Sequence, residues 1–253
     1  VEQDVSTVET VLIFDLGGGT FDVTVCAIGK SDCIELAKAG NNHLGGDDFD
    51  GAMMQLVLRR LRDATGVNFD DRQLQTLQYD LRQECRKKKE LLSTSAEATI
   101  YDTAWRQHPK ANTPGAGPVK ITRAEFEALI SQYIEDAMQL TQQALAEAHC
   151  SLSDIDKVLL VGGSTFIPLV RERLRALFGA EKVRVEVDPM QAVAHGAAIL
   201  AAMLPQSILC PQCRTDQSSA DTHCKQCGAA LTNTDGTTLP AYIGAKVEMV
   251  STI

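Results

Sequence analysis

The chain has 253 residues, of which 44% are hydrophobic and 23% are charged, and its formal net charge is -9. This composition is typical of a globular protein with a buried core, and an acidic chain without a basic stripe argues against nucleic acid as a partner. No apolar run reaches the ~18 residues that span a bilayer. Residues 1–10 are polar and acidic, unlike a signal peptide, so we expect a cytoplasmic protein without a membrane partner.

The first forty residues predict a β-meander. Residues 11–14 are apolar, residues 22–28 alternate between apolar and polar side chains, and residues 33–39 follow as a third strand. Period-two alternation is typical of strands with one buried face. A triple-glycine turn separates the first two strands, and a turn across residues 40–50 follows the third.

Helical spacing dominates the middle of the chain. We expect helices at residues 49–64, 71–92 and 122–149, the last with a capping box formed by Thr122 and Glu125. A strand at 98–101 and a proline- and glycine-rich loop at 106–118 separate the last two helices.

Strands and helices then alternate. We expect a strand at 157–161, a helix at 168–178 closed by Gly179, a strand at 183–187 and an alanine-rich helix at 189–204. A meander followed by βα units predicts an α/β fold, in which helices cover a mixed sheet. After residue 205 the chain becomes polar and cysteine-rich, which marks a domain boundary, and residues 247–253 could form a strand.

The octet Asp15 to Asp22 contains the consecutive glycines Gly17, Gly18 and Gly19. Glycine lets the backbone approach a ligand closely, and successive N–H groups in such a turn form an anion nest. A carboxylate beside a bound phosphate requires a cation between them, for which Mg²⁺ is the natural choice. The octet therefore predicts a phosphate site in which Asp15 orients or deprotonates a water, with a plain glycine-rich hairpin as the alternative.

A second glycine turn, Gly162 and Gly163 followed by Ser164, lies between a buried strand and a helix. Open α/β sheets bind ligands at this position, although a tight βα turn also requires small residues. Together the two turns could hold the two ends of one nucleotide.

Four segments, residues 15–22, 39–50, 159–170 and 188–198, resemble consecutive signatures of the seventy-kilodalton heat-shock (DnaK-type) chaperones in order and spacing. The resemblance covers residues 10–204. It implies the second lobe of an actin-like (ribonuclease H-like) ATPase, with residues 1–44 and 122–204 as its inner subdomain and 45–121 as its outer, α-rich subdomain. Outside the resemblance, we expect residues 205–232 to form a separate zinc ribbon and residues 233–253 to form a tail.

The resemblance implies ATP or ADP with Mg²⁺ as ligands, and unfolded client proteins and co-chaperones as partners. The implied catalytic residues, acting through Mg²⁺ and water, are Asp15, Thr20 and Asp22. The implied phosphate-end contacts are Gly17, Gly18, Gly19, Thr20, Gly45 and Gly46. The implied adenosine contacts are Gly162, Gly163, Ser164, Phe166 and Ile167, together with Arg86, Lys89 and Ser93 of the outer helix.

The sequence departs from the family at the adenosine end. Along the outer helix two charges are exchanged, so that Arg86 and Glu90 stand where the family has Glu and Arg, and they could pair across one helical turn. Phe166 replaces an arginine that faces the adenine; its ring can stack on a base but carries no cation. Met190 stands where an acidic residue is usual.

Only the second lobe is matched, so the resemblance supplies half of a cleft. Phosphoryl transfer is fast when preorganised charge surrounds the phosphates from both sides. We therefore expect ATPase activity in the complete family architecture, but weak ATP binding and negligible turnover from these residues alone.

Two CxxC pairs, Cys210 with Cys213 and Cys224 with Cys227, stand ten residues apart. Four thiolates at this spacing can bind Zn²⁺ tetrahedrally. Such a ribbon either staples a segment too small to fold unaided or docks a protein partner, and the sequence leaves both open. A thioredoxin-like redox motif fits poorly because two pairs occur outside a βαβ context. His223 is expected not to be a ligand.

Two functions remain in competition. One is an ATP-binding molecular chaperone of the heat shock protein 70 type, acting in protein folding and the stress response. The other is a non-catalytic interaction or scaffold protein built from a degenerate actin-like lobe and a zinc ribbon. A sugar kinase of the same fold is disfavoured because the four segments match the chaperones in order.

Overall fold

The computed structural model describes residues 8–29, 33–66, 75–100, 117–184, 188–203, 207–218 and 221–231. The chain divides into two compact units, residues 1–190 and 191–253. This division falls before the last long helix, earlier than the boundary expected at residue 205. Parts of five expected elements lie outside the described residues: the start of the helix at 71–92, the last residue of the strand at 98–101, most of the loop at 106–118, the end of the strand at 183–187 and the last residue of the helix at 189–204. The tail at 233–253 and its expected strand lie outside them entirely.

A five-stranded sheet with strand order β3-β2-β1-β6-β7 forms the centre of the first unit. Its antiparallel part is the expected meander, β1 (Glu9–Leu16), β2 (Phe21–Ile28) and β3 (Cys33–Asn41). Its parallel part adds β6 (Lys157–Val161) beside β1 and then β7 (Val183–Arg184). The mixed sheet confirms the predicted α/β fold.

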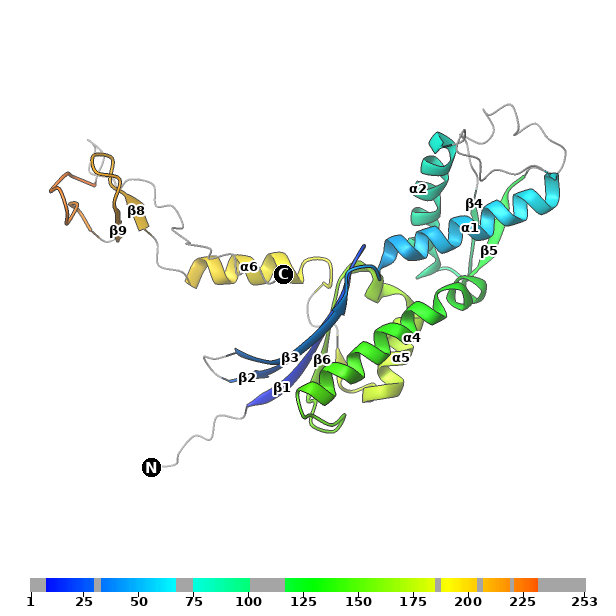
Figure 1. Ribbon diagram of the computed structural model, residues 1–253, viewed down its shortest axis with the longest axis horizontal. Helices are drawn as coiled ribbons and strands as arrows, with labels where there is room; N and C mark the ends of the chain where they lie inside the picture. Colours follow the sequence, from blue (N-terminus) through cyan, green and yellow to red (C-terminus); the bar gives the residue numbers. More distant parts are fainter. Residues whose placement is uncertain are drawn as a thin grey trace. The chain divides into compact units, whose positions relative to one another are not determined.

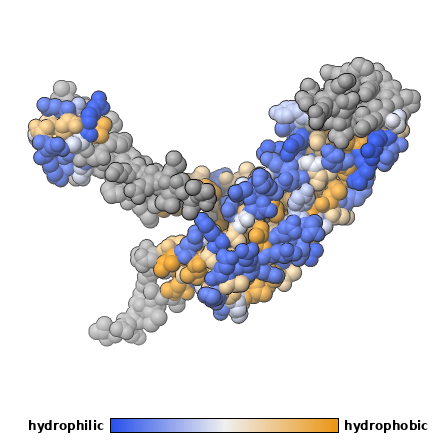
Figure 2. Space-filling view, viewed as in Figure 1, coloured by the Kyte–Doolittle hydropathy of each residue, from blue (hydrophilic) through white to orange (hydrophobic). Residues whose placement is uncertain are grey.

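Two helices, α4 (Arg123–Glu147) and α5 (Pro168–Phe178), lie along one face of this sheet (Figure 1). Phe126, Ile130 and Ile134 of α4 recur every four residues and are buried, as expected for an amphipathic helix. They pack into one core with the sheet residues Phe14 and Phe21, whose ring centroids are 4.8 Å apart. The outward side of α4 is mostly hydrophilic (Figure 2).

The outer part of the first unit consists of α1 (Gly46–Thr65), α2 (Gln75–Leu92) and a hairpin of β4 (Glu97–Ile100) with β5 (Val119–Thr122). The sequence analysis missed β5. Only two of its four side chains, Val119 and Ile121, are buried, and so short an alternation directly after a proline-rich loop carries little periodic signal.

The second unit contains α6 (Ala192–Met203) and a small hairpin of β8 (Ser207–Leu209) with β9 (Asp216–Ser218). Cys210, Cys224 and Leu231 form a buried cluster of their own, separate from the core of the first unit. None of the helices in the described ranges combines the length and the apolar character that a membrane span requires.

The expected capping box at the start of α4 is present. The backbone N–H and the hydroxyl of Thr122 both donate to Glu125 Oε2 at 2.8 Å, and Glu125 N–H donates to Thr122 Oγ1 at 3.3 Å. Arg60 of α1 donates to the other carboxylate oxygen of Glu125. These hydrogen bonds, those from Thr122 foremost, lower the pKa of Glu125 to about 2.

Replacing Glu125 by Gln is expected to lower the thermal midpoint at pH 7 and to have a shrinking effect in acid. The folded pKa of Glu125 lies below its ordinary value of 4.5, so its stabilisation is present above that value and is lost as the pH falls toward the folded pKa. The measurement is the difference in thermal midpoint between wild type and variant at pH 7 and pH 3. Glu135→Gln on the exposed side of α4 is the control; an equal difference at both pH values would contradict the prediction.

Candidate functional site

The two glycine turns that the sequence singled out lie against each other. The parallel register pairs Asp15 with Val161, so the ends of β1 and β6 are neighbours. Gly162 has a φ of +83°, and a Cβ built on it would lie 2.4 Å from the carbonyl oxygen of Leu16. The hydroxyl of Ser164 donates to the carbonyl of Gly17 at 2.8 Å. The two turns are therefore in direct contact, and their joint hold on one nucleotide stays a prediction.

A third glycine segment, Gly45 and Gly46 at the start of α1, packs on the same turn. The N–H of Gly46 donates to Gly17 O at 3.1 Å, and the N–H of Asp47 donates to Gly18 O at 2.6 Å. A Cβ on Gly45 would lie 2.6 Å from Gly18 O, closer than a real Cβ can approach. Glycine at position 45 is thus required by backbone contact.

The tip of the first turn is open. Gly18 and Gly19 are exposed, and a Cβ on either would meet nothing within 4 Å. Their N–H groups donate to no acceptor in the described part of the chain. Gly17 differs, because its N–H donates to Thr20 O at 3.0 Å and its carbonyl accepts from Gly46 and Ser164. Gly17 therefore closes the turn, whereas Gly18 and Gly19 present free amides.

Asp15 and Asp22 are direct cross-strand partners at the base of this turn. Like charges directly opposite each other in a sheet repel. Burial, and then the charge of Asp22, raise the pKa of Asp15. Two carboxylates facing each other next to open amides form an arrangement that a cation such as Mg²⁺ would relieve.

Lys89, predicted to reach the nucleotide from α2, is buried behind the third glycine segment. Its Nζ donates to Gly46 O at 2.7 Å and forms an ion pair with Asp50 Oδ1 at 2.8 Å. Burial raises the pKa of Asp50, and Lys89 partly offsets the increase. Lys89 thereby fixes the backbone at Gly46. The sequence analysis missed Asp50, although a buried lysine requires such a partner.

The exchanged charges on α2 form the expected pair. Arg86 Nε lies 3.5 Å from Glu90 Oε1, and both side chains are exposed. Ser93 follows at the end of α2, where its N–H donates to Glu90 O at 3.2 Å. The contact of these positions with adenosine stays a prediction.

A cation lies next to Phe166, although the residue itself is uncharged. It ends a short 3-10 helix, η3 (Gly163–Phe166), and is 40% exposed. The guanidinium of Arg171 lies 5.1 Å from its ring centroid, within cation–π range. Arg171 Nε is held by the carbonyl of Thr165 at 2.8 Å. The sequence analysis missed Arg171, which lies on the following helix.

Of the remaining predicted residues of the second turn, Ser164 and Ile167 are buried, and the two glycines are partly exposed. Ile167 is buried and caps α5. A Cβ on Gly163 would lie 2.8 Å from Met190 Sδ, so Met190 packs beside this glycine. Thr20 is exposed next to the open amides of the first turn.

Comparison with known proteins identifies the family. The family described as "Hsp70 protein" matches residues 2–211. The chain belongs to the Hsp70 family.

The Hsp70 relatives include curated proteins named "Chaperone protein DnaK". That of Thermotoga petrophila is 41% identical over 197 residues, and that of Thermosipho africanus is 40% identical over 199 residues. Each alignment covers 78% of this chain but 32% of the relative. The chain thus spans about a third of the length of the DnaK proteins it matches.

In the second unit, the four predicted zinc ligands come together. The Sγ atoms of Cys210, Cys213, Cys224 and Cys227 all lie within 4.8 Å of one another. The pairs Cys210–Cys227 and Cys213–Cys224 are each 3.5 Å apart. A tetrahedron with Zn–S bonds of about 2.3 Å has S–S edges of about 3.8 Å, so the four thiols fit Zn²⁺. His223 is not among the clustered ligand groups of the described residues.

Replacing Gly45 by Ala is expected to destabilise the first unit by about 2 kcal/mol or more, because the new methyl group would overlap Gly18 and force the turns apart. Urea unfolding measures the loss. Gly51→Ala in α1 is the matched control, since its Cβ would meet nothing within 4 Å and alanine is the better helix former by about 1 kcal/mol. The prediction is wrong if both variants shift the urea midpoint in the same direction.

Proposed function

We propose that the first unit is a nucleotide-binding lobe of an Hsp70-type chaperone, with the β/γ-phosphates of ATP or ADP at Gly18, Gly19 and Thr20. The observation that carries this proposal is the open pair of amides at the tip of a turn whose base is closed by hydrogen bonds of Gly17 and of the Gly18 carbonyl. Free N–H groups in succession bind anions. Carboxylates flank the same turn, which favours a phosphate accompanied by a cation over a free anion.

Asp15 and Asp22 would hold the Mg²⁺ of the nucleotide, directly or through water. Bound Mg²⁺ would neutralise phosphate charge. Asp15 is the better candidate to orient a water or accept its proton, because its raised pKa moves it toward the range of a general base. Gly45 and Gly46 would contribute by fixing the backbone beneath the phosphate turn.

At the adenosine end, Phe166 would supply a stacking surface and Arg171 the cation that the family places on the turn itself. Gly162, Gly163 and Ser164 would shape the backbone beside it, and Arg86 and Ser93 would approach from α2. Lys89 and Ile167 would act indirectly, since their side chains are buried.

As part of a complete chaperone, the lobe would act on unfolded client proteins together with co-chaperones in the cytoplasm. The relatives' name, chaperone protein DnaK, supports the chaperone part of this proposal. For the 253 residues alone we expect weak binding and turnover near the uncatalysed background, because charge from a single lobe surrounds the phosphates incompletely.

The second unit would be a zinc ribbon. Zn²⁺ would be held by the four cysteines and would supply the ordering energy that a segment of this size lacks. Either a structural staple or a docking module for a protein partner is compatible with this proposal.

The second candidate function is a non-catalytic scaffold, and one observation favours it. Lys89 is committed to Gly46 and Asp50, and Arg86 to Glu90, so charged groups expected at the nucleotide are engaged within the lobe. If the chain binds no nucleotide, the scaffold function is the candidate that remains.

Titration of Mg-ADP into the chain by calorimetry is expected to give saturable binding with a Kd of about 0.1 mM or weaker. Mg-ATP should bind similarly and turn over negligibly. Turnover at rates normal for a complete Hsp70 would overturn the half-cleft proposal, and no heat of binding at millimolar nucleotide would overturn the nucleotide proposal.

Asp15→Asn should abolish the magnesium-dependent part of nucleotide binding and yet raise the thermal midpoint of the free protein. The folded pKa of Asp15 is raised, so its ionised form costs stability, and the cost grows as the pH rises above the ordinary value of 3.8. Thermal melts at pH 5 and pH 8, with and without Mg-ADP, measure both effects. Asp63→Asn, exposed near the end of α1, should change neither.

Purified protein is expected to contain about one equivalent of zinc, since the four thiols form a complete tetrahedral ligand set. Elemental analysis measures the content, and Cys224→Ser should reduce it strongly. Less than about half an equivalent in the wild-type protein would overturn the zinc assignment.

A further inference from the structure

The two cysteine knuckles of the ribbon are built alike. In the first, Arg214 N–H donates to Cys210 O at 3.0 Å, and in the second, Gly228 N–H donates to Cys224 O at 2.9 Å. Arg214 and Gly228 both have positive φ, +61° and +73°. The N–H of the first cysteine of each knuckle donates to the carbonyl of Thr215 or of Ala229. Thr215 and Ala229 therefore occupy equivalent positions.

The two knuckles differ in the side chain at this equivalent position. Ala229 offers only a methyl group. The hydroxyl of Thr215 lies 2.9 Å from Cys213 Sγ and 3.6 Å from Cys224 Sγ. It therefore contacts one thiol of each knuckle.

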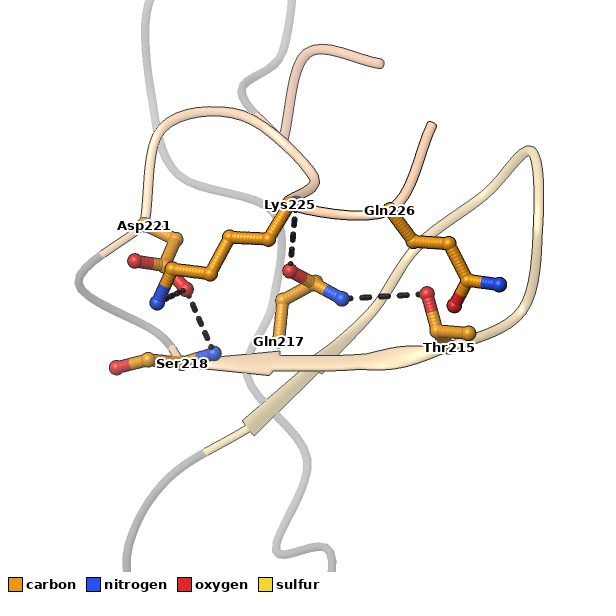
Figure 3. A pocket seen from close by; sticks show the side chains of 6 residues that line it. All are labelled: Thr215, Gln217, Ser218, Asp221, Lys225 and Gln226. Carbon is orange, nitrogen blue, oxygen red and sulfur yellow. Dashed lines mark hydrogen bonds and ion pairs between the residues drawn. The ribbon is translucent and has the colours of Figure 1, made fainter. Parts of the chain in front are cut away.

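The direction of the Thr215 hydrogen bond follows from its neighbours (Figure 3). Lys225 N–H is a donor only, and it donates to Gln217 Oε1 at 2.9 Å. The amide nitrogen of Gln217 then faces Thr215 and donates to its Oγ1 at 3.2 Å. Since Thr215 accepts from Gln217, its single hydroxyl proton is free to point at sulfur.

The chain of hydrogen bonds from Lys225 through Gln217 to Thr215 is fixed in position. Gln217 is 8% exposed, an unusual burial for a polar side chain. Its partner Lys225 lies between Cys224 and Cys227, so Gln217 ties β9 to the second knuckle. Asp221 closes the arrangement, 2.8 Å from Lys225 Nζ and accepting from Ser218 N–H at 3.2 Å.

We infer that Thr215 is a positioning residue of the zinc centre: oriented by Gln217, its hydroxyl donates to the Cys213 thiolate and holds the sulfurs of both knuckles in the geometry for metal. The inference rests on the proposed zinc site. Partners of metal ligands in the outer shell orient them, and their loss typically lowers metal affinity about 10- to 100-fold.

The test uses the full chain loaded with Co²⁺ in place of Zn²⁺, whose sulfur-to-cobalt charge-transfer band reports on hydrogen bonding to thiolate. Thr215→Val keeps the shape but removes the hydroxyl, and Thr215→Ser restores it. Thr222→Val is the matched control, since the Thr222 hydroxyl contacts His223 at 3.2 Å instead of a thiol. Gln217→Met removes the orienting amide and keeps the length of the side chain.

We expect Thr215→Val to shift the band to lower energy and to weaken zinc binding about 10- to 100-fold in competition with a chelator. Thr215→Ser and Thr222→Val should match wild type, and Gln217→Met should shift the band in the same direction as Thr215→Val. Complete loss of metal from Thr215→Val, with normal binding by Thr215→Ser, would also support the inference.

A normal wild-type cobalt spectrum that Thr215→Val and Gln217→Met leave unchanged would overturn this inference alone. Equal effects of Thr215→Val and Thr222→Val would likewise overturn it. A wild-type chain that binds neither Co²⁺ nor Zn²⁺ would overturn the zinc assignment and the inference together.

Discussion

The carbonyl of Gly17 is the junction on which the first unit's candidate site depends. It accepts hydrogen bonds from Gly46 N–H and Ser164 Oγ, and so joins the β1–β2 turn to the start of α1 and to the turn after β6. Backbone can come this close only where side chains are absent, which explains why Gly45 and Gly162 flank the junction. Gly17 is engaged through both its N–H and its carbonyl, whereas the N–H groups of Gly18 and Gly19 have no acceptor within the residues that the structure describes. The exposed amides of Gly18 and Gly19 thus lie next to backbone contacts that close the base of the turn.

The same site retains an unfavourable interaction. Asp15 and Asp22 oppose each other across the hairpin, and burial adds to the cost of ionising Asp15. Substitutions that remove such a cost are readily found, but they commonly reduce function. A repulsive carboxylate pair beside preorganised amides is expected where a bound cation and anion supply the attraction. In a hairpin with a purely structural role, the same pair would only lower stability.

Much of this could be predicted from sequence because the relevant signals are local. Alternation located β1 to β3, the Thr122 and Glu125 box marked the start of α4, and the glycine clusters indicated where backbones meet. The ends of long side chains could not be located this way. Whether Lys89 extends into a cleft or back to Asp50, and whether Arg171 reaches Phe166, depends on contacts between elements that periodicity does not encode. The division of the chain before α6 was also unforeseen, since the alanine-rich composition of that helix suits either unit.

The described part of the zinc ribbon contains very few buried apolar side chains. Among its described residues, the buried cluster consists of Cys210, Cys224 and Leu231, too few to offset the entropy of ordering the segment. Order must therefore come from metal and from directed polar contacts. A tetrahedral metal alone would treat the two similar knuckles almost equivalently. The hydroxyl of Thr215, aimed by the buried amide of Gln217 and absent at Ala229, removes that near-symmetry, and the polar network thereby defines one arrangement of the four sulfurs.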